Sequence, residues 1–355
     1  MVMLNPVSAI GAGTLVNLGT TNSVTVGKNV ILAATSGSVI YGTGSNHEAI
    51  INGTLISQGI TIFYANGAAT GNSVTVGKTG EVFAFGGSGV AIACLGSSAT
   101  VTNHGYVESS TYGLAFIGNG AATHSMVVNT GTIKAGTLAI FRDASNTTET
   151  IEVKNSGLIE SAGTAYGYTN AGHNAKDIIT NTGVMIGAVR LDNGADIYDG
   201  RKGRIDGDVF GGGDADILKG GKEGNTFYGD AGQDKLTGGL GGDILTGGAD
   251  ADQFIYLSAK DSTAKAAGQD TIIDFNQGQG DQINLKAIDA DSRTGGNQKF
   301  DFIDDGPFHG HAGELRFKIV LDDTFIYGDT NGDKKADFVI KLDTAVELTA
   351  GDFIL

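Results

Sequence analysis

An asparagine recurs at a constant interval in the first half of the chain, at Asn103, Asn129, Asn155 and Asn181. Each lies in a short segment of alternating apolar and polar residues, with a glycine two positions after the asparagine, as in residues 101–107. The alternation predicts short strands and the glycine predicts a turn. A unit of this size cannot bury its own apolar face, so successive copies must stack. The repeat therefore predicts a parallel β-helix with one coil per unit.

Two columns of side chains support this register. In the stack the four asparagines fall in one column, where their amides can hydrogen-bond from coil to coil. The position three residues after each motif glycine holds Glu108, Lys134 and Glu160, so opposite charges lie one strand apart, which stabilises neighbouring strands. Weaker copies of the segment between residues 26 and 82 extend the pattern toward the N-terminus.

A nine-residue repeat then runs without a gap over residues 211–255. Each unit begins with glycine, has Asp or Asn at its sixth position and an apolar residue at its eighth. The glycines let the backbone turn tightly and direct carbonyl oxygens inward. The acid adds a hard anionic ligand, and calcium takes six to eight oxygen ligands. The regular apolar spacing argues against a flexible Gly-Asp linker, so we expect a calcium-binding parallel β-roll with two units per coil.

In this roll we expect Asp216, Asp234 and Asp252 to line one edge, and Asn225 and Asp243 to line the other. Asn225 replaces an acid, and Asp214, Glu223 and Asp250 replace the glycine at the fourth position, which predicts sites that are weaker or differently coordinated. The candidate metal-binding residues of the repeat share its glycine and acid positions. They are Gly211, Gly213, Asp214, Asp216, Gly220, Asn225, Gly229, Gly232, Asp234, Gly238, Gly241, Asp243, Gly247, Asp250 and Asp252.

A second candidate calcium site lies near the end of the chain, in residues 329–337. Asp329, Asn331, Asp333 and Asp337 provide oxygen side chains at positions 1, 3, 5 and 9 around a central glycine. The spacing resembles the start of an EF-hand loop without its final glutamate. An Asx-rich turn between two strands accounts for the same residues equally well, and the sequence leaves both interpretations open.

The nonapeptide resembles the hemolysin-type calcium-binding repeat of the RTX family. Residues 270–275, 280–285, 312–317 and 352–355 in addition resemble the C-terminal module of serralysin-type proteins, which Gram-negative bacteria secrete. The resemblance implies Ca²⁺ as the cofactor, export by a type I secretion apparatus that reads an uncleaved C-terminal signal, and an extracellular location. The metalloprotease half of these proteins is missing, and the repeated coils of the first half stand in its place, so protease activity is not implied.

These features predict an all-β protein of three parts. Residues 1–200 form the parallel β-helix, residues 201–256 the RTX β-roll, and residues 257–355 a serralysin-type domain with a β-sandwich-like cap and the secretion signal. The Met1–Val16 stretch has no basic residue before its apolar part, which excludes a Sec-type signal. No apolar run approaches the length of roughly 18 residues that a membrane-spanning helix needs, so we expect no membrane span.

The charge of the chain is concentrated in its second half. Residues 1–190 contain 8 of the 39 acids and 7 of the 23 bases, which leaves 31 acids and 16 bases beyond them. A compact region with this excess repels itself unless cations neutralise it. The balance excludes a generic nucleic-acid binder and favours calcium as the partner.

The sequence favours a secreted calcium-binding protein whose β-helix is a structural or adhesive module that calcium helps to fold or cap outside the cell. Its expected partner is a cell-surface component or an extracellular polysaccharide. The alternative is a polysaccharide-active enzyme, a lyase or C5-epimerase type, with an RTX module. We identify no catalytic residue: His47-Glu48 begins a zinc-protease motif, but Ile51 stands where its second histidine must be, so that motif fails.

Overall fold

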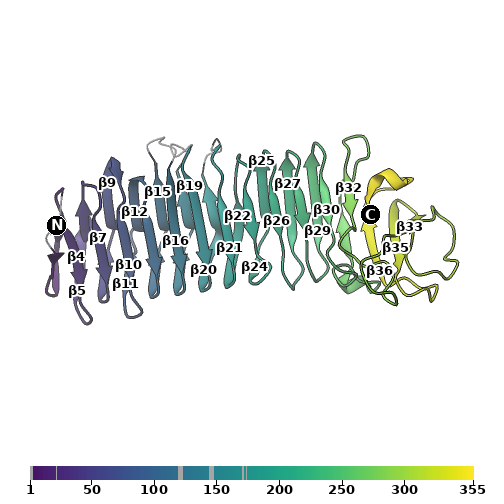
Figure 1. Cartoon of the computed structure of the whole chain (residues 1–355). Helices are drawn as coiled ribbons and strands as arrows, with labels where there is room; N and C mark the ends of the chain where they lie inside the picture. Colours follow the sequence, from purple (N-terminus) through teal and green to yellow (C-terminus); the bar gives the residue numbers. More distant parts are fainter. Residues whose placement is uncertain (1–2, 21, 119–122, 144–147, 170–171, 173) are drawn as a thin grey trace. The chain divides into compact units, whose positions relative to one another are not determined.

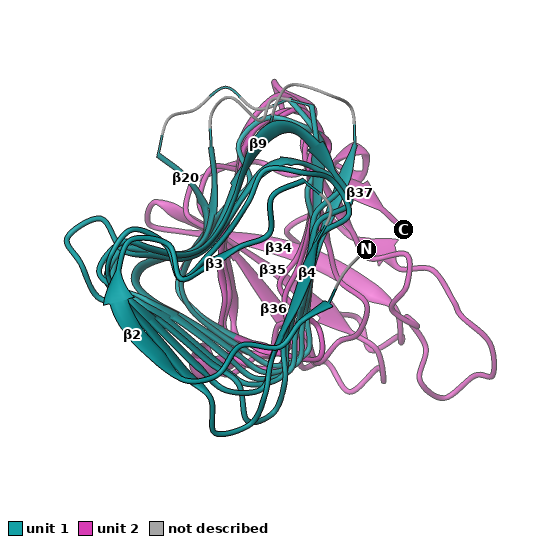
Figure 2. Cartoon of the chain, turned by 90° about the vertical axis from the view of Figure 1, so that its left-hand side faces the viewer, with its two compact units in different colours: residues 1–194, 205–207 teal, residues 195–204, 208–355 magenta. Residues whose placement is uncertain are grey.

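The computed structural model describes the whole chain except residues 1–2, 21, 119–122, 144–147, 170–171 and 173. It is all-β, with 52% of residues in strands, which confirms the expected fold class. Within the described residues the only helical turns are the 3₁₀ segments η1 (Ala266–Gly268) and η2 (Ala350–Asp352), and no helix there is long and apolar enough to span a membrane. Two compact units are present, residues 1–194 with 205–207, and residues 195–204 with 208–355 (Figure 2).

Unit 1 is a parallel β-helix built from three ladders of strands (Figure 1). The first ladder consists of β1 (Met3–Leu4), β4 (Ser23–Val26), β7 (Glu48–Ile51), β10 (Ser73–Val76), β13 (Thr100–Asn103), β16 (His124–Asn129), β19 (Thr150–Asn155) and β21 (Ile178–Asn181). The second consists of β2 (Ala9–Ala12), β5 (Ile31–Ser36), β8 (Thr54–Ser57), β11 (Glu81–Ala84), β14 (Tyr106–Ser109), β17 (Thr132–Ala135), β20 (Leu158–Tyr168) and β22 (Val184–Arg190). The third consists of β3 (Val16–Asn17), β6 (Ile40–Gly42), β9 (Ile60–Thr70), β12 (Val90–Ser97), β15 (Tyr112–Ile117) and β18 (Leu138–Arg142), and ends on the second half of β20.

The register of unit 1 is the one that the repeat predicts. Val127 pairs with Val101 on one side and with Val153 on the other, each one whole repeat away. All three side chains are fully buried, because inward-facing residues of successive coils stack into one continuous core. Strands β1–β3 form an additional coil before the first copy that the sequence pattern identifies.

The asparagine column is a hydrogen-bonded ladder, as predicted. Asn103 Nδ2 donates to Asn129 Oδ1 at 2.8 Å, Asn129 Nδ2 to Asn155 Oδ1 at 2.8 Å, and Asn155 Nδ2 to Asn181 Oδ1 at 2.9 Å. Each of these amides is almost fully buried. The ladder ends toward the N-terminus because Val76 occupies the place that pairs with Asn103, so the earlier coils lack the motif's asparagine.

One buried ion pair breaks the repetition inside unit 1. Arg142, only 1% exposed, contacts the fully buried carboxylate of Asp177, and Tyr166 Oη donates to the same carboxylate at 2.5 Å. Arg142 Nη2 also donates to the carbonyl of Glu149 at 2.5 Å. Because burial penalises an isolated charge, burial itself raises the pKa of Asp177, although Arg142 opposes this effect.

Unit 2 contains two ladders of parallel strands, and one of them ends in antiparallel strands. One ladder consists of β23 (Ile197–Asp199), β26 (Ile217–Lys219), β28 (Lys235–Thr237), β30 (Gln253–Ile255), β32 (Gln282–Asn284) and β37 (Phe353–Ile354). The other consists of β25 (Val209–Gly213), β27 (Thr226–Ala231), β29 (Ile244–Ala249), β31 (Asp270–Ile272), β36 (Phe338–Leu342), β35 (Asp323–Asp329), β34 (Glu314–Val320) and β33 (Asp301–Phe302). Strand β24 (Arg204–Asp206) is shared between the two units. Strands β34, β35 and β36 pair antiparallel.

Candidate calcium sites

Two nonapeptides make one coil of unit 2. Ile217 pairs with Lys235, and Thr226 pairs with Ile244, so each residue lies beside its equivalent two units further on. The apolar eighth-position residues are fully or almost fully buried, and they are Leu218, Phe227, Leu236, Leu245 and Phe254. Their burial between the two ladders leaves the glycine-rich turns and the acids at the edges, as the repeat predicts.

The sixth-position acids form two hydrogen-bonded columns. On one edge the Asp216 N–H donates to Asp234 Oδ1 at 2.7 Å, and the Asp234 N–H donates to Asp252 Oδ1 at 2.9 Å. On the other edge the Asn225 N–H donates to Asp243 Oδ1 at 2.7 Å. Each bond joins adjacent coils, so the edge assignment made from the sequence holds in the structure.

The second carboxylate oxygen of each acid is buried and has no hydrogen-bond donor. This is the case for Oδ2 of Asp216, Asp234, Asp243 and Asp252, whose side chains are all about 1% exposed. An ionised carboxylate that is buried without a donor or a cation is very unfavourable. Each of these four oxygens is therefore available to contact a cation.

The pKa values of these acids reflect the same burial. Burial raises the pKa of Asp216 to about 8, of Asp243 and Asp252 to about 7, and of Asp234 to about 6. Repulsion from neighbouring carboxylates raises the pKa of Asp216 further, and among these carboxylates Asp234 contributes most. A cation beside these groups would oppose both contributions and lower these pKa values, because it favours the ionised form.

The first-position glycines are required because their backbones lie against these carboxylates. A Cβ on Gly211, Gly229 or Gly247 would come within 2.3 Å of Oδ2 of the acid five residues later, and on Gly238 within 2.0 Å. At Gly220 a Cβ would lie 2.0 Å from the Gly238 carbonyl oxygen. Carboxylate and carbonyl oxygens thus surround the same small spaces, and oxygens of these two kinds are what calcium binds.

The remaining candidates of the repeat lie in its turns. Gly232 and Gly241 have φ of 130° and 121°, and Asp214 and Asp250 have φ of 71° and 77°. Asp tolerates this left-handed region better than most residues, which explains how the two acids occupy a glycine position, with exposed side chains. Gly213 is the last residue of β25.

The donor set fits calcium bound by one carboxylate per turn together with main-chain oxygens. Among the described residues no group of three or more His, Cys, Asp or Glu side chains is placed to hold a metal ion, so a site made of side chains alone is not present there. With main-chain carbonyls as further ligands, the glycine and acid positions of the repeat would hold the ion. The individual metal-binding residues named from the sequence remain predictions.

Three acids outside the nonapeptides continue the columns and were missed in the sequence. The Asp243 N–H donates to Asp270 Oδ1 at 2.9 Å, the Asp252 N–H donates to Asp281 Oδ1 at 3.0 Å, and the Asp196 N–H donates to Asp216 Oδ1 at 2.7 Å. Oδ2 of Asp270 is also buried without a donor, and burial raises the pKa of Asp270 to about 9. Each of the three is followed two residues later by a buried apolar side chain, the pattern that could have identified them.

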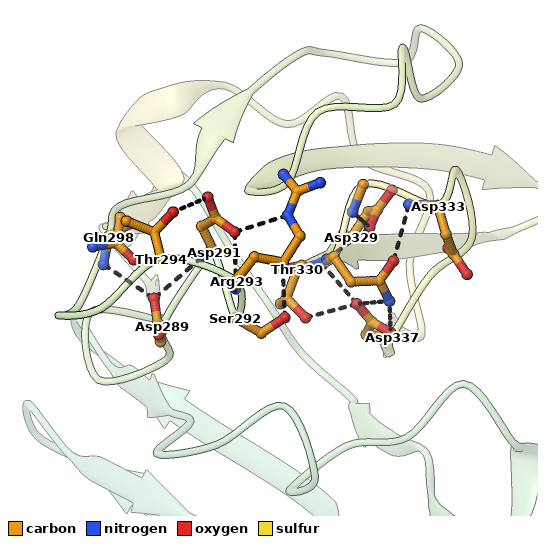
Figure 3. Close-up of polar contacts among 12 residues, drawn as sticks. Asp289, Asp291, Ser292, Arg293, Thr294, Gln298, Asp329, Thr330, Asp333 and Asp337 are labelled. Carbon is orange, nitrogen blue, oxygen red and sulfur yellow. Dashed lines mark hydrogen bonds and ion pairs between the residues drawn. The ribbon is translucent and has the colours of Figure 1, made fainter.

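The loop over residues 329–337 has its carboxylates engaged by the protein (Figure 3). Asp329 accepts the N–H groups of Asn331 and Gly332, at 3.1 Å and 2.6 Å. Asp337 Oδ2 accepts the N–H and the hydroxyl of Thr330, each at 2.7 Å. These are the bonds of an Asx-rich turn, which is one of the two interpretations that the sequence left open. Calcium binding by this loop stays a prediction.

One family model matches the part of the chain that contains the nine-residue repeat. Residues 205–355 match the family model described as peptidase M10 serralysin C terminal. This part of the chain is a serralysin-type RTX module. RTX modules generally bind calcium, and serralysin C-terminal modules are typically secreted by type I systems. No curated protein matches the chain.

The solved structures that are similar to the chain include two subunits of one bacterial enzyme. The R3 subunit of the mannuronan C5-epimerase of Azotobacter vinelandii is 22% identical, with a TM-score of 0.26, and the match covers 51% of this chain and 78% of that one. The R2 subunit of the same enzyme is also 22% identical, with a TM-score of 0.28, over 41% of this chain and 88% of that one. Likeness at this level does not establish a shared function.

Proposed function

We propose that the chain is a secreted calcium-binding RTX protein in which the RTX module folds on binding calcium outside the cell, and in which the β-helix is a structural or adhesive module. The observation that carries the proposal is the set of buried carboxylate oxygens without donors along the two aspartate columns. Bound calcium would supply the positive charge that these oxygens lack. Without it, the folded module retains the electrostatic cost of the buried acids.

The calcium affinity of such sites determines on which side of the cell envelope the module folds. Ligand sets of extracellular modules bind calcium at about 10⁻⁴–10⁻³ M, and the binding free energy of a site that forms only on folding is folding free energy. In a cytosol poor in calcium the acidic module stays unfolded, as a polypeptide must to be threaded through a type I exporter. Outside the cell, calcium concentrations reach the range in which the module folds.

The β-helix suits a structural or adhesive role because its coils are regular. The coils paired through Val101, Val127, Val153 and Ile179 all keep the length of one repeat, which leaves no long insertion there to build the walls of a deep catalytic cleft. A repetitive surface presents the same groups several times along one axis, and repeated weak contacts give strong attachment. The enzymatic alternative stays a prediction.

Calcium titration of the full chain tests the proposal. After removal of divalent ions, far-UV circular dichroism should show an incomplete β signal that rises cooperatively with calcium in the range of about 10⁻⁴–10⁻³ M, and magnesium should not replace calcium. A signal that is complete in chelator and unchanged by calcium would contradict calcium-coupled folding. Export is tested by expressing the chain with and without a type I exporter, where the protein should reach the medium only with the exporter.

A further inference from the structure

An outer strip of aromatic and charged side chains runs along the second ladder of unit 1. It consists of Phe83, Phe85, Tyr106, Glu108, Lys134 and Glu160, which lie on or directly after β11, β14, β17 and β20. Phe83 pairs with Glu108, Glu108 with Lys134, and Lys134 with Glu160 in the parallel register. Phe83, Glu108, Lys134 and Glu160 therefore lie on neighbouring strands, about 4.8 Å apart, on the face opposite the core.

The end of the strip nearer the N-terminus is an aromatic platform. Phe85 is 51% exposed, and its ring is stacked with that of Phe83 at a centroid distance of 5.4 Å and an interplanar angle of 20°. The ring of Tyr106 lies 5.7 Å from that of Phe83. Phe85 is exposed, and Phe83 and Tyr106 are partly buried, so the three rings place neighbouring aromatic faces at the surface of the β-helix.

The other end of the strip is a hollow lined by charged side chains and by small or apolar residues. Tyr106 Oη donates to Glu108 Oε2 at 3.0 Å, and Lys134 Nζ lies 3.0 Å from Glu160 Oε1. Glu108, Lys134 and Glu160 line a hollow of about 310 Å³, together with small residues such as Gly136 and Ala162. Each glutamate uses one carboxylate oxygen in these contacts and retains the other to accept hydrogen bonds from a ligand.

We propose that the outer strip binds a linear, uncharged polysaccharide that lies along the helix axis. The apolar C–H face of a sugar ring packs on an aromatic ring, and its hydroxyl groups donate to carboxylates and accept from an ammonium group. Along the helix axis the strip offers aromatic rings first and charged groups after them, with one charged group in each coil. A linear chain of sugar rings presents the matching alternation of apolar faces and hydroxyl groups.

The charge of the strip selects among polysaccharides. Glu108 and Glu160 against Lys134 give the strip a net charge of −1, and the ammonium of Lys134 is already paired with Glu160. A polyuronate or a nucleic acid would meet repulsion here, whereas an uncharged glycan would not. The inference rests on the adhesive role proposed above and names its ligand class.

Affinity electrophoresis of the full chain in calcium tests this inference. The probes are a soluble neutral β-glucan and a polyuronate of similar length, each cast into the native gel at increasing concentration. The variants are Phe85→Ala and Glu108→Gln, and the matched control is Leu257→Ala, because Leu257 is 50% exposed and lies in unit 2. Calcium-titrated circular dichroism of each variant reports separately on the RTX module.

We expect the neutral glucan to retard the protein and the polyuronate to have no effect. Phe85→Ala and Glu108→Gln should each raise the Kd for the glucan at least tenfold, whereas Leu257→Ala should leave it unchanged, with the same calcium titration for all. Failure of the glucan to retard the wild type, stronger retardation by the polyuronate, or wild-type binding by Phe85→Ala would overturn the inference. Self-association that Phe85→Ala abolishes in sedimentation would also overturn it, in favour of a second copy as occupant. Loss of the calcium response with glucan binding intact would refute only the calcium-coupled folding.

Discussion

A single methyl group at Gly229 is expected to disrupt one calcium site without removing any ligand. In Gly229→Ala the new Cβ would lie 2.3 Å from Asp234 Oδ2 and 2.4 Å from the Gly247 carbonyl oxygen, whereas real Cβ contacts are at least 3.0 Å. The two oxygens must therefore move away by about 0.7 Å and about 0.6 Å, whereas metal–ligand distances tolerate deviations of only about 0.2 Å. Both displacements exceed this tolerance threefold.

We expect this displacement to weaken calcium binding at the affected turn at least tenfold, which is about 1.4 kcal/mol. The assay is isothermal titration of calcium into the full chain after treatment with chelator, at neutral pH and constant ionic strength. The matched control is Gly295→Ala, because a Cβ on Gly295 meets nothing within 4 Å and the substitution restricts the unfolded chain equally. Neither glycine has a positive φ, so backbone strain does not distinguish the two variants.

The result that would refute this reasoning is a calcium titration of Gly229→Ala that cannot be distinguished from that of Gly295→Ala. The oxygens beside Gly229 would then not be ligands. A second variant, Asp234→Asn, retains the acceptor for the Asp216 N–H and removes the charge. It should also weaken binding, and it keeps the test decisive if the alanine variant does not fold.

Three further predictions concern pH and the β-helix. Burial raises the pKa of the nonapeptide acids to between about 6 and about 8 in the calcium-free fold, above about 3.9 in an unfolded chain. The calcium-free module should therefore gain stability as the pH falls from about 8 to about 4 and lose it as the pH rises, so circular dichroism in chelator should show more folded protein at pH 5 than at pH 8. Asn129→Ala removes bonds to both neighbours in the ladder and should lower the free energy of unfolding by about 3 kcal/mol in urea, whereas Thr102→Ala should cost at most about 1 kcal/mol. Arg142→Met leaves Asp177 buried without its cation and should cost about 3–5 kcal/mol, much of which Arg142→Met with Asp177→Leu should restore in thermal unfolding.

The parts of the fold that could be predicted are those in which a residue recurs at a constant interval. Asn129 and Asp234 each stand one whole coil from an equivalent residue, so their neighbours follow from the interval alone. Asp270 and Asp281 belong to the same columns but follow their partners by 27 and 29 residues, because the coils lengthen after residue 255. The constant interval is lost there, and the acids could be found only through the apolar residue two positions later.

Contacts that occur once could not be predicted from periodicity. Arg142 and Asp177 are 35 residues apart, an interval that matches no repeat, so their pairing depends on the three-dimensional path of the chain. The coil formed by β1–β3 has neither the asparagine nor the glycine spacing of the later copies, and its strands pair with β4, β5 and β6 through the backbone. Backbone pairing of this kind does not require particular residue types, so the sequence pattern does not indicate it.

The asparagine ladder gives the coils between Asn103 and Asn181 the same hydrogen bonds to the preceding coil and to the following coil. Asn129 and Asn155 each donate from Nδ2 to the following coil and accept through Oδ1 from the preceding one, so their coils are interchangeable. A gene segment encoding one coil could thus be duplicated or deleted between Asn129 and Asn155, and the new neighbours would meet through the same bonds. Copy number is therefore a variable that recombination can change while the protein stays folded, and the length of the β-helix can evolve in whole coils.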